Sequence, residues 1–292
     1  MNASISVVVT THNRFDCLVE ACRSAAMQTL APAEIIIVDD GSATPVATIW
    51  KESVPFATDI SIRFVRLEDE GPSKARNAGA RIASGEFIAF LDDDDLMAPE
   101  YLATASACLA RDSAEVSVTW LRCFDGHREW PGKHFPTDHL THDPYRNNIG
   151  FVGSNIVIRR GLFMDLGGFD TNLLGSEDKD LYVRLRRCDA KITVVEMELV
   201  RYRVHGGEQA SGSFRFHPFQ VSGKTKFLHK HGADMSVATY RALAADAGWF
   251  RLMGGDTWSD RWSGLGDVVR FDITKLRSLW PALKARAARD WQ

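Results

Sequence analysis

The stretch Glu86–Leu96 reads EFIAFLDDDDL, so that five apolar residues run directly into four consecutive aspartates. A short apolar run of this kind is typical of a strand buried on both faces of a sheet. The carboxylates of Asp92–Asp95 would then lie at the carboxyl end of that strand, where ligands bind in open α/β sheets. Adjacent like charges repel, so the cluster predicts a divalent cation. The alternative is a solvated acidic turn that caps the next helix.

Three further strands are predicted upstream of this stretch: Ser4–Thr10 (SISVVVT), Glu34–Val38 (EIIIV) and Ile62–Leu67. Helical segments separate them, one of them with Asn13 as a candidate N-cap and another following Pro72. Such alternation favours an α/β fold with parallel strands and right-handed crossovers. Polar clusters close three of the four strands and should meet at one edge of the sheet: Thr10–Asn13, Asp39–Ser42 and Asp92–Asp95.

Downstream, strands are predicted at Glu115–Trp120, Asn155–Ile158 and Lys191–Arg203, and a helix opens within SEDKDLYVRL (Ser176–Leu185). Between Phe124 and Asn148 the periodicity disappears. This segment contains four histidines, but their spacing fits no metal-ligand motif, which favours a loop that covers a binding pocket.

Beyond Ser213 the composition becomes helical, with candidate helices at Phe219–His231, Ser236–Met253 and Ile273–Ala288. We therefore expect a catalytic α/β domain over residues 1–213 and a C-terminal helical region over residues 214–292. The helical region should be interrupted at four glycines, Gly254, Gly255, Gly264 and Gly266.

The composition is that of an ordinary globular protein, with 292 residues, 45% hydrophobic and 25% charged. A formal net charge of −3 gives no general attraction to nucleic acid. The five cysteines are scattered and form no CxxC pair, which indicates reduced thiols of a cytoplasmic protein, three of them in the core. We find no signal-peptide pattern and no apolar run long enough for a membrane span, so a soluble or peripheral protein is expected.

The strand-end groups suit a ligand that combines a base, phosphates and a metal ion. Asp39 or Asp40 could accept hydrogen bonds from a base edge. Lys74 and Arg76, near a helix start, suit phosphate oxygens. Of the aspartates at 92–94, one could hold a ribose diol and another Mg²⁺ or Mn²⁺ on a diphosphate. This combination indicates a nucleotide-diphosphate donor.

Five segments resemble the successive motifs of family 2 glycosyltransferases with the GT-A fold: VVVTTHNR, IIIVDDGS, GPSKARNAGARIASGEFIAFLDDDDLMAP, GGFD and SEDKDLYVRL. The resemblance covers roughly residues 4–210. It implies a Rossmann-like, mostly parallel sheet flanked by helices, and an inverting transfer from a nucleotide-sugar, most often a UDP-sugar, to a hydroxyl of a glycan or lipid-linked acceptor. Polysaccharide or lipopolysaccharide assembly is the usual setting.

The resemblance also implies roles for individual residues. Asp94 would bind the metal ion, and Asp92 or Asp93 the ribose, with the register open by one residue. Asp178 would be the catalytic base, with Glu177 the next candidate. An ordinary carboxyl pKa of about 3.9 would leave Asp178 ionised at neutral pH. The remaining assignments are to the donor (Thr10, Thr11, Asn13, Asp39, Asp40, Lys74 and Arg76) and to the metal or diphosphate (His205).

Three alternative functions stay open from the sequence. A sugar-1-phosphate nucleotidyltransferase would share the acidic site, but it needs a glycine-rich loop after the first strand, and no glycine precedes Gly41. An aspartyl phosphatase normally has Thr or Val where Leu96 stands. A non-catalytic nucleotide-sugar-binding subunit would not need both Asp94 and Asp178.

The C-terminal segment carries an apolar stripe at helical spacing, made of Leu276, Leu279, Trp280 and Leu283. From Lys275 to Gln292 there are five basic residues and one acidic residue. A basic, tryptophan-containing helix suits an anionic membrane surface, so residues 275–289 could give peripheral contact with the inner face of the membrane. The alternative is that the stripe packs on the preceding helices.

Overall fold

The computed structural model describes residues 3–53, 56–146, 148–204, 218–254 and 258–272. The chain divides into two compact units. The first comprises Met1–Thr171 and Glu177–Gly206, and the second comprises Asn172–Ser176 and Gly207–Gln292.

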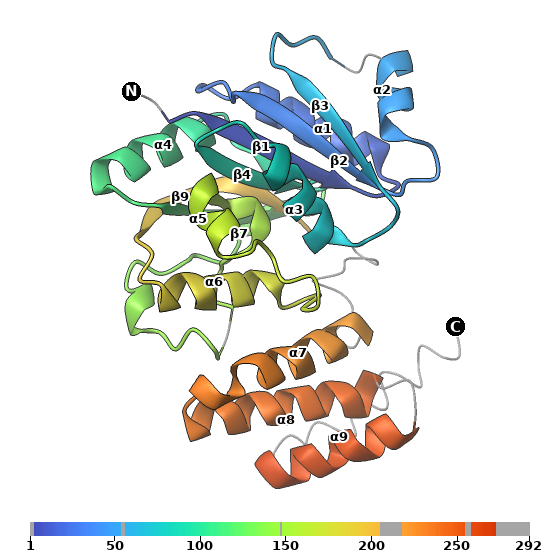
Figure 1. Cartoon of the computed structure of the whole chain (residues 1–292), viewed down its shortest axis with the longest axis vertical. Helices are drawn as coiled ribbons and strands as arrows, with labels where there is room; N and C mark the ends of the chain where they lie inside the picture. Colours follow the sequence, from blue (N-terminus) through green and yellow to red (C-terminus); the bar gives the residue numbers. More distant parts are fainter. Residues whose placement is uncertain (1–2, 54–55, 147, 205–217, 255–257, 273–292) are drawn as a thin grey trace. The chain divides into compact units, whose positions relative to one another are not determined.

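The first unit is built on one sheet, which has nine strands within the described residues and the order β3-β2-β1-β4-β8-β6-β9-β5, with β7 paired to β6 (Figure 1). Parallel pairs join β3, β2, β1 and β4, and also β6 with β9, while the shorter ladders to β8, β5 and β7 are antiparallel. The bounds are β1 (Ile5–Thr11), β2 (Glu34–Asp40), β3 (Ile62–Leu67), β4 (Phe87–Asp92), β5 (Leu96–Met97), β6 (Val116–Phe124), β7 (Glu129–Pro131), β8 (Ile156–Arg159) and β9 (Ile192–Arg203).

Helices cover both faces of this sheet, because successive residues of the central strands point to opposite sides. Val7 and Val9 of β1 belong to one apolar cluster and Val8 to the other. The first cluster packs under α1 (Phe15–Ala26), α2 (Val46–Ser53) and α4 (Tyr101–Asp112). The second packs under α3 (Pro72–Ile82), α5 (Arg160–Asp165) and α6 (Glu177–Arg187).

The register of the parallel strands brings three polar clusters to one edge of the sheet. Thr11 of β1 lies opposite Asp39 of β2, and Thr10 lies opposite Asp92 of β4. The α/β fold, the mostly parallel sheet and the meeting of these clusters at one edge are confirmed.

Several sequence-based expectations for local structure were wrong. The stretch Phe124–Asn148 is not entirely irregular: it contains β7, which is too short for periodicity to reveal, and a 3₁₀ turn at His139–Thr141. Helix α5 was not predicted. Of the five cysteines, two rather than three are buried, Cys22 and Cys108.

The second unit contains α7 (Pro218–His231), α8 (Val237–Gly254) and α9 (Trp258–Phe271). The expected interruption at Gly264 and Gly266 is wrong, since both lie inside α9. A side chain at Gly264 would place its Cβ 2.5 Å from the carbonyl oxygen of Gly248, so glycine lets α9 approach the backbone of α8. The expected helix Ile273–Ala288 and its apolar stripe lie outside the described residues. Of the helices that are described, none combines the length and the apolar character needed to cross a membrane.

Candidate active site

The acidic turn begins where β4 ends, at Asp92. The N–H of Asp95 donates to the carbonyl of Asp92 at 3.1 Å and closes the turn. Asp95 points inward, is 1% exposed, and accepts from the backbone N–H of Arg203 at 3.0 Å. Burial, together with Asp94 and Asp92, raises the pKa of Asp95 well above its ordinary value. The hydrogen bond between Asp95 and Arg203 therefore fixes the acidic turn to the end of β9.

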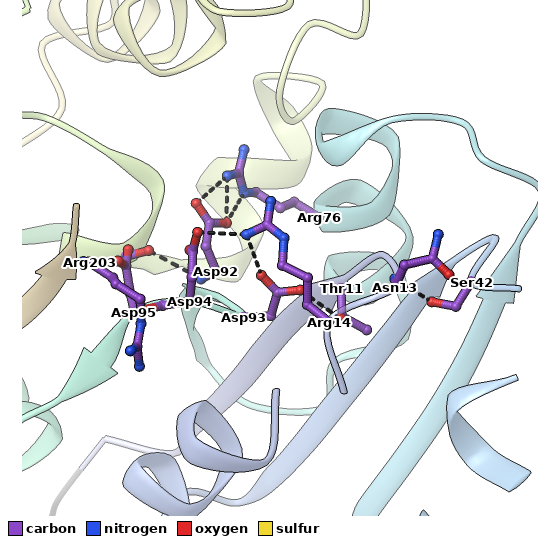
Figure 2. Close-up of polar contacts among 11 residues, drawn as sticks. Thr11, Asn13, Arg14, Ser42, Arg76, Asp92, Asp93, Asp94, Asp95 and Arg203 are labelled. Carbon is purple, nitrogen blue, oxygen red and sulfur yellow. Dashed lines mark hydrogen bonds and ion pairs between the residues drawn. The ribbon is translucent and has the colours of Figure 1, made fainter. Parts of the chain in front are cut away.

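Arg14, which directly precedes α1, neutralises the middle of this turn. Its Nη1 donates to Asp94 at 2.6 Å and to Asp93 at 3.2 Å (Figure 2). The hydroxyl of Thr11 also donates to Asp93, at 2.7 Å. Burial raises the pKa of Asp93 to about 7, although Arg14 and Thr11 oppose the shift. The sequence predicted that a divalent cation neutralises the acidic cluster. In the structure Arg14 supplies a positive charge to Asp93 and Asp94.

A tight turn at Asn13 sets the position of Arg14. Asn13 has a φ of 57°, in the left-handed region that asparagine tolerates. Its backbone N–H donates to the hydroxyl of Ser42 at 2.9 Å, and its side-chain oxygen accepts from the N–H of Ala43 at 2.8 Å. In this structure Asn13 joins the loops after β1 and β2, while its predicted contact with the donor stays a prediction.

Asp39 and Asp40 both have partners within the chain. Asp39 accepts from the backbone N–H groups of Ser42 and Val46, and from Arg66 at 2.6 Å. Asp40 accepts from the N–H groups of Glu70 and Gly71, at 2.8 and 2.7 Å. These carboxylates fix the loops around the predicted base site, and their binding to a base stays a prediction.

Arg76 of α3 lies inside the site and is 5% exposed. Its Nη2 donates to both carboxylate oxygens of Asp92, at 2.6 and 2.8 Å. Its Nη1 lies 3.7 Å from Oε1 of Glu177. The guanidinium is thus committed to carboxylates, whereas Lys74 is half-exposed and pairs with Glu70 at 3.3 Å. The predicted contacts of Arg76 and Lys74 with phosphate stay predictions.

Asp178 lies in the first turn of α6, beside Glu177. Its Oδ1 is buried and has no hydrogen-bond partner among the described residues. Burial, with Glu177 and Asp92 nearby, raises the pKa of Asp178 to about 8, although Arg76 opposes the shift. The expectation of an ordinary carboxyl pKa is therefore wrong, because sequence spacing does not show how much solvent a side chain loses on folding.

The donor set of the acidic turn consists of carboxylate oxygens, which suit Mg²⁺ or Mn²⁺. Within the described residues, however, no three histidine, cysteine, aspartate or glutamate side chains converge as a metal-binding group. Binding of a divalent cation at this turn stays a prediction. His205, the other predicted ligand, lies outside the described residues.

Sequence reasoning assigned no role to three residues that shape the site. Arg14 follows the predicted donor residue Asn13, and that position was the available signal. The hydroxyl oxygen of Ser154 accepts from the backbone N–H of Asp92, the last residue of β4, with an N–O distance of 3.1 Å. Arg203 donates from Nε to the Asp94 carbonyl at 2.9 Å and pairs with Glu20 through Nη2. No local pattern marks Ser154 or Arg203.

Two known proteins illustrate the sequence similarity of this chain. YwdF of Bacillus subtilis, an uncharacterized glycosyltransferase, is 31% identical over 189 residues, which are 62% of this chain and 67% of YwdF. The O-antigen biosynthesis protein RfbC of Myxococcus xanthus is 29% identical over 215 residues, 72% of this chain and 16% of RfbC. The chain thus spans two thirds of one relative and less than a fifth of the other.

The fold has solved counterparts. The crystal structure of S. aureus TarS 1–349 in complex with UDP-GlcNAc superposes with a TM-score of 0.67 and 21% identity, over 92% of this chain and 80% of that one. This likeness shows the GT-A fold. Residues 125–234 match the profile described as Glycosyltransferase like family 2, and residues 6–167 match Glycosyl transferase family 2. Because the latter profile covers more than half of the chain, the protein belongs to glycosyl transferase family 2.

Proposed function

We propose that this protein is an inverting glycosyltransferase that moves a sugar from a nucleotide-diphosphate donor to a hydroxyl acceptor. The observation that carries the proposal is the buried Arg76, which contacts Asp92 at the end of β4 and lies 3.7 Å from Glu177 at the start of α6. Arg76 thus joins two acidic groups that are far apart in sequence. Through it Asp92, proposed to bind the donor, lies in one cluster with Glu177 and the neighbouring Asp178, the candidate bases.

Asp178 is proposed as the catalytic base. A pKa near 8 makes the Asp178 carboxylate a stronger proton acceptor than an ordinary aspartate, and the ionised form that can act as a base becomes the major form as the pH rises through 8. Its Oδ1, which has no hydrogen-bond partner in the part of the chain that the structure describes, would accept the proton of the attacking hydroxyl. Attack from the face of the sugar opposite the leaving diphosphate would invert the anomeric configuration.

The donor would lie along the edge formed by β1, β2 and β4. We propose Asp40, with Asp39 behind it, for the base, Asp92 or Asp93 for the ribose, and Asp94, with His205, for a divalent cation. Such a cation, Mn²⁺ or Mg²⁺, would neutralise the charge of the departing diphosphate when bound. In the structure the carboxylates around this edge are oriented by backbone N–H groups, Thr11 and arginines.

The relatives support the proposed donor and biological setting. The solved TarS complex contains UDP-GlcNAc, which supports a UDP-sugar donor. RfbC acts in O-antigen biosynthesis, which supports polysaccharide or lipopolysaccharide assembly. We further propose residues 1–213 as the catalytic region, with residues 275–289 in peripheral contact with the membrane that holds a lipid-linked acceptor.

A coupled assay for released products tests the proposal directly. Purified protein is incubated with a panel of nucleotide-sugars, Mn²⁺ or Mg²⁺, and candidate acceptors. Release of nucleoside diphosphate supports glycosyl transfer. A parallel reaction supplies nucleoside triphosphates and sugar 1-phosphates, and release of pyrophosphate there would instead identify a nucleotidyltransferase. Binding without turnover in both reactions would favour a non-catalytic subunit.

The assignment of the cation to Asp94 makes a separate prediction. Asp94→Asn removes one charged oxygen ligand while keeping the size of the side chain, so we expect UDP binding in the presence of Mn²⁺ to weaken at least about tenfold by calorimetry. UDP binding without metal should change little. Unchanged metal-dependent binding would assign the cation to another residue.

A further inference from the structure

Arg14 contacts the acidic turn, and the role inferred for it here rests on the proposed function, in which that turn is the site of the divalent cation and the diphosphate. We propose that Arg14 is an exchangeable counter-ion. Its guanidinium neutralises Asp93 and Asp94 while no donor is bound, and it leaves Asp94 for the diphosphate when the cation and the nucleotide bind together.

The contacts of Arg14 show what it neutralises. One nitrogen, Nη1, donates to both Asp93 and Asp94, and these side chains are only 7% and 13% exposed. Ionised carboxylates that have lost most of their solvent are costly unless a positive charge is close. Arg14 meets this need for two of the four aspartates in the turn, and its contacts to both are seen in Figure 2.

Arg14 differs from Arg76 in its freedom to move. The Arg14 side chain is 42% exposed, whereas that of Arg76 is 6% exposed and has both Asp92 oxygens as partners. Arg14 also makes no side-chain capping bond to α1, whose first turn it precedes. The guanidinium can therefore leave the acidic turn by side-chain rotation, while the backbone stays fixed through the two hydrogen bonds of Asn13 with the loop after β2.

This arrangement predicts a coupling between metal and nucleotide. A cation that arrives alone at Asp94 must displace the guanidinium, which then lacks an anionic partner. When a diphosphate arrives with the cation, it offers the guanidinium new anionic oxygens, so the displacement costs less. Metal and nucleotide should thus each strengthen the binding of the other by the same factor.

The chain provides a matched control for this test. Arg63 pairs with Glu34 at the opposite end of the parallel strands, with an Nη1–Oε2 distance of 2.9 Å and side chains 44% and 5% exposed. This pair resembles the Arg14–Asp94 pair in exposure and lies away from the acidic turn, and Nη1 of Arg63 donates to the Ile82 carbonyl at 2.8 Å where Nη1 of Arg14 donates to a second carboxylate. Arg63→Gln therefore reports the general effect of removing a half-exposed arginine from a buried carboxylate.

The experiment measures Mn²⁺ binding by calorimetry, with and without UDP, in wild type, Arg14→Gln and Arg63→Gln. We expect Arg14→Gln to bind Mn²⁺ alone about tenfold more tightly than wild type, with a smaller enhancement by UDP, within the usual range of coupling between sites. Arg63→Gln should match wild type. An Mn²⁺ affinity in Arg14→Gln within twofold of wild type, measured without UDP, overturns the proposal.

Two further observations separate this inference from the proposed function. If wild type binds Mn²⁺ with UDP but Arg14→Gln behaves like wild type, only the counter-ion role fails. If wild type binds no Mn²⁺ even with UDP, the metal-dependent function fails and the counter-ion role fails with it. A crystal structure of wild type with Mn²⁺ and UDP tests the counter-ion role even if Arg14→Gln does not fold. If Nη1 of Arg14 still lies within 3.5 Å of the Asp94 carboxylate in that structure, the proposed exchange is contradicted.

Discussion

Two carboxylates, Glu34 of β2 and Asp178 of α6, differ in how fully their oxygens are paired by hydrogen bonds. Glu34, at the start of β2, accepts hydrogen bonds from Ser6, from the N–H and hydroxyl of Ser84, and from Arg63, at 2.7–2.9 Å. Burial opposes its ionisation, but these bonds outweigh burial and lower the pKa of Glu34 to about 2. Asp178, in the proposed active site, has an oxygen without a partner among the described residues and a pKa raised to about 8.

The difference indicates what each group contributes. A buried carboxylate with all of its acceptor positions filled ties together the segments that supply the donors, here β1, β3 and the turn after α3. A desolvated carboxylate with one oxygen left unpaired, as Asp178 has among the described residues, destabilises its own ionised form, and this is tolerated where chemistry needs a proton acceptor. Glu34 is therefore expected to act on folding, and Asp178 on catalysis.

The largest expected effect that tests this difference is on turnover. Asp178→Asn preserves the side-chain volume but removes the proton acceptor, so kcat should fall by about 100-fold to 10,000-fold with little change in donor affinity. The measurement is the coupled assay for nucleoside diphosphate, combined with UDP binding by calorimetry.

Glu177→Gln is the control for this prediction, because Glu177 is the neighbouring carboxylate and lies 3.7 Å from Arg76. If Asp178→Asn keeps activity within about threefold of wild type while Glu177→Gln loses it, Glu177 is the base instead.

The second prediction concerns stability. Glu34→Gln keeps the shape of the side chain but replaces one acceptor oxygen by an NH₂ group that faces donors, so the free energy of unfolding should fall by about 2 kcal/mol. Urea denaturation measures this change. The activity of the folded fraction should stay within about threefold of wild type, and a loss of turnover without a loss of stability would contradict the structural role.

The sequence predicted much of this edge of the sheet. Runs such as SISVVVT and EIIIV are apolar on both faces, which marks central strands, and parallel strands bring their ends together whatever the details of packing. For this reason Asp39, Asp92 and Thr11 could be placed at one edge before any coordinates. The predicted catalytic and binding roles of the individual side chains are not tested by the structure.

What could not be predicted depends on contacts between distant residues. Arg14 meets Asp93 and Asp94 across 79 and 80 positions of sequence, and no local pattern specifies such a pair. Gly264 appeared to be a helix breaker because its tight contact with Gly248 of another helix is invisible in the sequence. The raised pKa of Asp178 likewise follows from burial by residues on other elements.

The smallest expected effect is a pH dependence of stability with opposite sign at the two carboxylates. The folded-state pKa of Asp178, about 8, lies above its ordinary value of 3.8, so wild type loses stability as the pH rises through this interval and the group ionises. The side chain of Asp178→Asn does not ionise, so the melting temperature of this variant relative to wild type should increase between pH 5.5 and pH 8.5.

For Glu34 the folded-state pKa, about 2, lies below the ordinary 4.5, so its contribution to stability is complete above pH 4.5 and is lost as the pH falls toward 2. The deficit of Glu34→Gln relative to wild type should accordingly shrink between pH 6 and pH 3.5. Thermal unfolding of the three proteins without metal or nucleotide measures both trends, each of a few degrees. Parallel trends in the two variants would show that the two carboxylates do not differ in the way their hydrogen bonds indicate.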